Sequence, residues 1–176
     1  MSTSNSMNTA VAADAPNHSK VNTKKVTGRR KLHFNTLAEI QADAERLAAI
    51  NVRQLGNWPL GYALSHIAGA MRISLDGANF RVPFYIRLIV PLFKKKMLRD
   101  PMPAGFQLPK KASKQLIPDR QVSIEEGLND LRATIDRLNR EPQRHPSPVF
   151  GPMTREEWDQ LHCRHSELHL SFFVPE

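Results

Sequence analysis

The sequence predicts an all-α fold, a bundle of four helices with a long crossover segment between the second helix and the third. Helix-start signals occur at four places along the 176 residues, and apolar residues at helical spacing follow each of them. Strand signals are weak throughout, and no internal repeat is present. These observations favour a single helical domain.

Three of the helix starts are capping boxes, in which a Ser or Thr side chain and a Glu three residues later satisfy each other's free amides. The pairs are Thr36 with Glu39, Ser123 with Glu126, and Thr154 with Glu157. The fourth start is Asn57 followed by Trp58 and Pro59, because a proline in the first helical turn loses no hydrogen bond. We therefore expect helices to begin after residues 36, 57, 123 and 154.

The last helix has an unusual core-facing row. The rows of the first three helices are apolar, whereas the row of the fourth contains a histidine. Its members are Trp158, Leu161, His165, Leu168 and Phe172.

The crossover segment, residues 78–120, contains an apolar stretch that is too short and too interrupted by Arg87 and Pro91 for a membrane span. We expect one short helix at about residues 83–98, packed on the bundle. Residues 84–96 also suggest an apolar face with a basic rim for another subunit or an acidic surface, but simple coverage of the bundle is the favoured interpretation.

Residues 1–29 are predicted to form a disordered basic tail and residues 30–176 the helical domain. The tail is rich in small polar residues and Lys and has no apolar periodicity, so burial cannot offset the entropy of ordering it. The formal net charge of +8 comes largely from the tail and from one lysine run, without interleaved aromatic residues, so we expect no nucleic-acid partner. The lone cysteine, Cys163, and the absence of a signal-peptide pattern predict a cytoplasmic protein.

Four histidines are candidates for a metal site. His165 and His169 lie one helical turn apart, a spacing that lets two imidazoles share one ion, and His66 stands on the predicted second helix. At about 100° per residue, His162 falls on the same side of the last helix as this pair, whereas Cys163 lies almost opposite His165. We expect Cys163 to be a buried or half-buried small residue outside the ligand set, and His162 to lie at the rim of the site or on the surface.

Several segments resemble those of a known family. They are residues 56–61 leading to His66, residues 81–84, residues 102–105 with 108–109, and residues 150–151 with Trp158, His165, His169 and Leu170. In these segments the chain, from about residue 30 onward, resembles the DinB/YfiT-like superfamily of metalloproteins, and within it the domain-of-unknown-function family 1569.

The resemblance implies a four-helix bundle of up-down-down-up topology that binds a divalent metal through His66, His165 and His169. It also implies a small-molecule or thiol substrate, as in thiol-dependent relatives, and a homodimer. Members of this branch often have a histidine beside the last ligand, where this chain has Leu168, and His162 is the residue that could replace it. Imidazole ligands leave the metal open among zinc, nickel and iron.

Two functions follow from this pattern. The first is a metal-dependent transferase or hydrolase, although no carboxylate can be assigned as its general base. The alternative is a non-catalytic helical bundle that binds a partner or subunit, with the histidines hydrogen-bonded in the core. Trp58 and Trp158 are expected to be core aromatics, with a place in the lining of the pocket as the less favoured alternative.

Overall fold

The computed structural model describes residues 20–105 and 116–176, and this part of the chain is mostly helical, as predicted. Its longest helices are α1 (Leu37–Ala48), α2 (Leu60–Asp76), α6 (Ile124–Arg140) and α7 (Arg155–Leu170). The shorter elements are η1 (Thr23–Lys25), β1 (Val52–Gln54), α3 (Phe84–Ile89), η2 (Val90–Phe93), α4 (Lys94–Arg99) and β2 (Phe173–Pro175). Residues 1–19 of the predicted tail and residues 106–115 of the crossover segment lie outside the described residues.

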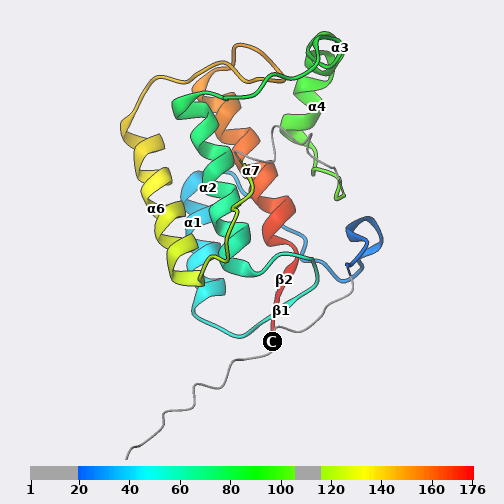
Figure 1. The fold of residues 1–176 in the computed structure, drawn as a ribbon, viewed down its shortest axis with the longest axis vertical. Helices are drawn as coiled ribbons and strands as arrows, with labels where there is room; N and C mark the ends of the chain where they lie inside the picture. The colour runs from blue at the N-terminus through cyan, green and yellow to red at the C-terminus, as the bar shows by residue number, and fades with distance from the viewer. Residues whose placement is uncertain (1–19, 106–115) are drawn as a thin grey trace, which may run out of the picture.

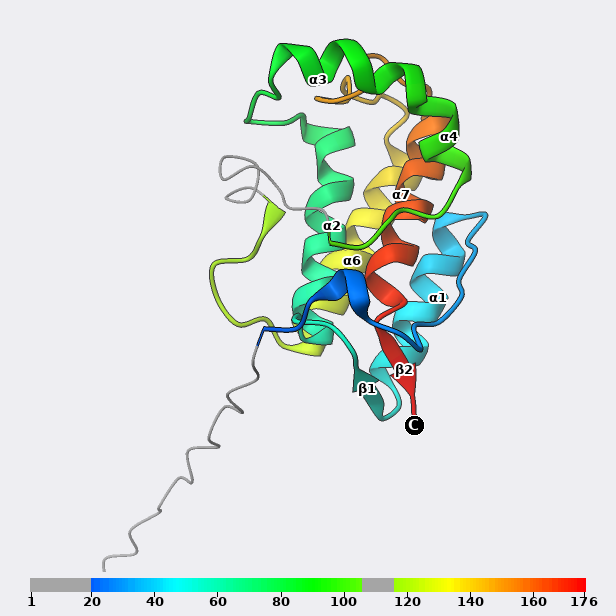
Figure 2. The same ribbon diagram turned by 90° about the vertical axis from the view of Figure 1, so that its right-hand side faces the viewer.

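The four long helices pack side by side (Figure 1). Helix α2 lies along α6 and also contacts α7, and α1 contacts both α6 and α7. Figures 1 and 2 show that α2 and α6 run in one direction and that α1 and α7 run in the other. One apolar cluster draws on all four helices, with Ile40, Leu64, Leu131 and Leu170 completely buried in it.

Three of the four predicted helix starts are confirmed. Ser123 and Thr154 form complete capping boxes at the starts of α6 and α7. The box at α1 is incomplete. Thr36 accepts a hydrogen bond from the Glu39 amide at 3.3 Å, but the Glu39 carboxylate accepts from the amide of Asn35.

The predicted start of α2 at Asn57 is wrong. The helix begins at Leu60, and Pro59 precedes it without a side-chain cap. Asn57 instead pairs with the backbone of Val21, accepting from its amide at 2.7 Å and donating to its carbonyl at 2.9 Å. The Asn57 side chain is therefore hydrogen-bonded to a residue distant in sequence, and it does not cap the helix that follows.

Residues 20–29, which we expected to belong to the tail, make contacts with the helical part of the chain. Besides the Val21 pairing, the Arg29 guanidinium lies 4.5 Å from the centre of the Phe172 ring, and its Nε donates to Ser171 Oγ at 3.1 Å. Composition predicts that such a segment lacks apolar burial, but it does not reveal a few specific polar contacts. For residues 1–19 the tail stays a prediction.

Arg30 fastens the chain that precedes α1 to two helices. Its guanidinium donates two hydrogen bonds to the Asp43 carboxylate, at 2.8 and 2.6 Å, and one to the carbonyl of Leu170 at 3.0 Å. Arg46 also pairs with Asp43. Burial alone would raise the pKa of Asp43, but the hydrogen bonds and charges of the two arginines outweigh it and hold that pKa below its usual value.

We expect Asp43→Asn to lower the free energy of unfolding by about 1–2 kcal/mol at neutral pH, because an amide cannot pair with both guanidinium groups. A carboxyl with a lowered pKa in the folded state stabilises the fold above its unfolded pKa, and that contribution disappears as the pH falls through the folded pKa. The difference between wild type and variant should therefore shrink below about pH 4. Urea unfolding at neutral and acid pH measures it, and a difference independent of pH would contradict the assignment.

The predicted core row of α7 is wrong in part. Leu161 and Leu168 are only half-buried, whereas Arg164 and Glu167 are buried. These two side chains pair with each other at 2.6 Å, and both bond the main chain of Phe34. The buried side of α7 thus carries an ion pair bound to the backbone, where apolar residues were expected. The side that carries the histidine pair is only half-buried.

The crossover segment forms the predicted helical stretch, but in three pieces. Pro91 lies at the start of η2, between α3 and α4, where a missing amide interrupts the α-helical hydrogen bonds. Figure 2 shows this stretch across the end of the molecule away from the two strands. Helix α4 packs against α7, whereas large apolar side chains of α3 and η2 are exposed, so the favoured expectation that they cover the bundle is wrong. Within residues 20–105 and 116–176, no helix has the length and apolarity needed to cross a membrane.

Strands β1 and β2 form a small antiparallel pair that the sequence did not reveal. Val52 pairs with Pro175 and Gln54 with Phe173, and the amide of Leu55 extends the ladder to the carbonyl of Phe172 at 2.9 Å. Three-residue strands are too short to display an alternating pattern. The pair connects the segment before α2 to the end of α7.

Candidate metal site

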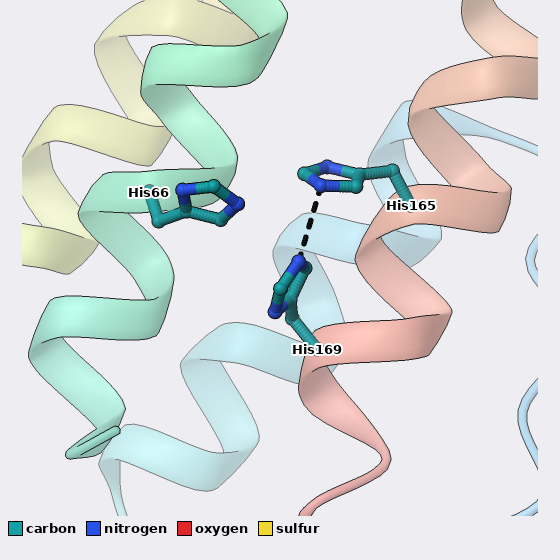
Figure 3. A group of neighbouring side chains, drawn as sticks. All are labelled: His66, His165 and His169. Carbon is teal, nitrogen blue, oxygen red and sulfur yellow. Dashed lines mark hydrogen bonds between the residues drawn. The ribbon is translucent and has the colours of Figure 1, made fainter. Parts of the chain in front are cut away.

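The structure brings together the three histidines that were expected to bind a metal. His66 extends from α2 toward α7, which carries His165 and His169 (Figure 3). Their candidate ligand nitrogens all lie within 4.8 Å of one another. The group contains no carboxylate or thiol, so its donors are three imidazoles.

The His165 and His169 side chains are arranged as two ligands of one ion would be. Their Nε2 atoms are 3.1 Å apart, and their rings are steeply inclined, at 75°. Two nitrogens bound to one ion at about 2.1 Å, with tetrahedral or octahedral angles, are about 3.0–3.4 Å apart. Between neutral imidazoles the same contact is a hydrogen bond in which one Nε2 carries a proton, and an ion bound to both nitrogens would displace that proton.

The orientation of His66 is set by a backbone atom. Its Nδ1 lies 2.7 Å from the carbonyl oxygen of Leu116, which can only accept, so Nδ1 carries the proton. Nε2 is then left with a free lone pair, and His66 faces both other rings, with centroids 5.2 Å from His165 and 4.6 Å from His169. A hydrogen bond of this kind on the far nitrogen is typical of histidines that bind metals.

Burial lowers the pKa of all three imidazoles. For His66 the hydrogen bond to Leu116 partly opposes the effect of burial on the pKa. For His165 and His169 the pKa lies well below the usual value, because the neighbouring histidines, and Arg29 in the case of His169, add to the effect of burial. Neutral rings retain the lone pairs that a cation requires.

Trp58 forms a wall of the site, which was the less favoured of the two places expected for it. Its ring lies parallel to that of His169, at 8° and 5.2 Å between centroids, and its distance to the His66 ring is 4.8 Å. It is half-buried rather than buried. Trp58, Tyr62 and His66 follow one another at intervals of four, a spacing that would have indicated a shared face.

The prediction for His162 is wrong, because this residue lies in the interior and outside the group of three. Its ring stacks on Trp158 at 5.4 Å, and its Nε2 is 3.1 Å from Ser74 Oγ. Since the Ser74 hydroxyl donates to the carbonyl of Met71, it accepts from His162. Burial lowers the pKa of His162 to about 3. His162 is therefore a neutral core residue and does not replace the missing histidine at Leu168.

Cys163 has the surroundings of an inert thiol. It belongs to the apolar cluster between the helices and is almost completely buried, as expected. Burial raises the pKa of its thiol to about 12, so the reactive thiolate is absent at neutral pH.

The donor set fits a divalent ion with a free coordination position. Three protein nitrogens would occupy three of the four coordination positions of a tetrahedral ion and leave the fourth for water or a substrate atom. Neutral ligands also leave the charge of the ion uncompensated, which favours an anionic fourth ligand. Glu167, the buried acid on the same helix, is bound to Arg164 and Phe34 and does not join the group.

Comparison with curated proteins gave no match, and comparison with solved structures gave none either. The family model described as "Protein of unknown function (DUF1569)" matches residues 26–176. Because this match covers most of the chain, the protein belongs to the DUF1569 family.

Proposed function

We propose that this protein is a DinB-like four-helix bundle that binds one divalent metal ion through His66, His165 and His169. The observation that carries the proposal is the convergence of three neutral imidazoles from two helices. The opposed directions of the α1/α7 and α2/α6 pairs support an up-down-down-up arrangement (Figure 1). The metal is zinc, nickel or iron, all of which accept imidazole ligands.

The activity proposed for this centre is a metal-dependent transfer or hydrolysis on a small-molecule or thiol substrate. A bound ion would supply a Lewis acid that lowers the pKa of a water or thiol in its open position. The chain's own contribution is positional. Leu116 fixes the tautomer of His66, and Trp58 holds the ring plane of His169 and covers one side of the site.

Elemental analysis of the purified protein tests the metal site. We expect about one equivalent of metal in the wild type and none in His165→Ala/His169→Ala, with helicity by circular dichroism unchanged. A matched control is His33→Ala/His145→Ala, which removes two exposed histidines outside the site and should retain the metal. If neither the wild type nor the control takes up zinc or nickel, the histidines are structural, and partner binding becomes the better function.

Activity is a separate question from binding. The metal-loaded protein should be screened with thiol-transfer and hydrolysis substrates, and any turnover compared with that of His66→Ala. Turnover that survives this substitution in a folded protein would exclude the centre as its source.

A further inference from the structure

The helical stretch from Phe84 to Arg99, here called the α3–α4 arm, displays large apolar side chains to solvent. Phe84, Leu88 and Leu92 are 80%, 72% and 80% exposed, and Tyr85, Ile89 and Phe93 are 52–55% exposed. Within α3 the spacing of four residues places Phe84 with Leu88, and Tyr85 with Ile89, in two adjacent rows. Leu92 and Phe93 follow on η2 and are exposed as well. Contiguous exposed apolar patches on a monomer usually mark an interaction surface.

The described residues provide no cover for these rows. Helix α4 is anchored on α7, but α3 packs mainly on the adjoining η2. Figure 2 shows the arm projecting across the end of the bundle, with α3 beyond the end of α2. The exposed apolar side chains therefore lie at one end of the molecule.

The arm and the three residues that precede it carry only positive charges. Residues 81–99 contain six Lys and Arg residues and no Asp or Glu. Lys94 pairs with Glu157 and Arg99 with Asp100. The remaining four basic residues are exposed, and no ion pair joins them to the described residues; they are Arg81, Arg87, Lys95 and Lys96.

We propose that the α3–α4 arm binds the surface of an anionic lipid bilayer. Its exposed Phe, Tyr and Leu side chains suit insertion at the level of the headgroups, and its unpaired Lys and Arg suit the negative surface potential of anionic lipid. A second copy of the chain would bring like charge against like charge at the same patch.

Co-sedimentation with lipid vesicles tests the proposal. The full chain is expected to bind vesicles of phosphatidylcholine with phosphatidylserine, to bind vesicles of phosphatidylcholine alone much less, and to be released by added salt. Phe84→Ser/Leu88→Ser/Leu92→Ser should weaken partitioning by about a hundredfold or more, because three large apolar side chains would no longer be available for burial in the lipid. Lys95→Glu/Lys96→Glu should weaken it as well.

Matched controls distinguish binding through the arm from an effect of the overall hydrophobicity or charge of the protein. Ile50→Ser/Ile124→Ser removes exposed apolar residues elsewhere, and Lys20→Glu/Lys25→Glu makes the same change of charge away from the arm, so both should retain binding. Absence of binding to the anionic vesicles at low salt would overturn the proposal, as would equal binding by the triple Ser variant. A wild-type dimer that the triple Ser variant converts to a monomer, without lipid binding, would instead make the arm an interface between copies.

Discussion

Adding zinc or nickel to metal-free protein is expected to raise its melting temperature by about 10 °C, and His66→Ala is expected to abolish most of this increase. The three imidazoles come from helices far apart in sequence, so the unfolded chain offers no comparable site. A ligand that binds only the folded state stabilises it by about 4 kcal/mol when its free concentration is a thousand times its Kd. For a chain of this length, each kcal/mol corresponds to a shift of about 2–4 °C.

Differential scanning fluorimetry with metal and with a chelator measures this linkage. His33→Ala/His145→Ala is again the control, because it removes exposed histidines that could bind metal weakly without touching the site. The same rise in His66→Ala as in the wild type would show that the ion binds elsewhere.

Gly127→Ala is expected to destabilise the protein by about 2 kcal/mol or more, even though alanine is the better helix former. A Cβ at this position would overlap the backbone carbonyl of Gly61, where α6 and α2 approach each other closely. Gly61 is constrained in the same close approach, since a Cβ there would overlap the backbone at Val122 and Ser123, just before α6 begins. Backbone cannot move aside as a flexible side chain can, so the helices would have to separate.

Asn129→Ala is the matched control for Gly127→Ala, since it introduces the same residue at an exposed position of α6. It should leave the free energy of unfolding nearly unchanged. Because α2 also carries His66, Gly127→Ala should in addition weaken metal binding in the fraction that remains folded. A glycine variant as stable as the wild type would show that the helices tolerate a wider separation.

Local signals allowed most helix boundaries to be predicted, while long-range contacts caused the errors. The capping boxes at Ser123 and Thr154 involve residues three apart, so sequence alone contains both partners. Asn57 also looked like a helix cap, but its side chain is hydrogen-bonded to the backbone of Val21. The assignment of the face of α7 failed for the same reason, because the buried Glu167 is stabilised by the distant main chain of Phe34.

The candidate site was predictable to the extent that side-chain spacing defines it. The interval between His165 and His169 placed both rings on one face of a helix. His66 was a candidate from its position on the predicted second helix, and the family resemblance joined it to the pair as a ligand. The carbonyl of Leu116 could not have been found, since a backbone oxygen has no residue signature. Nor did spacing distinguish His162, which turns into the interior to reach Ser74.

The pairing of the two short strands sets the position of Trp58 relative to His169 along the chain. Gln54 pairs with Phe173, and Trp58 follows Gln54 by the same four positions by which His169 precedes Phe173. A slip of β2 by one residue would displace one chain against the other by about 3.3 Å, enough to unstack the indole from the imidazole. The register of β1 and β2 therefore determines whether Trp58 and His169 stack. Insertions or deletions in residues 55–57 or 170–172 should disturb this stacking before they disturb the helices.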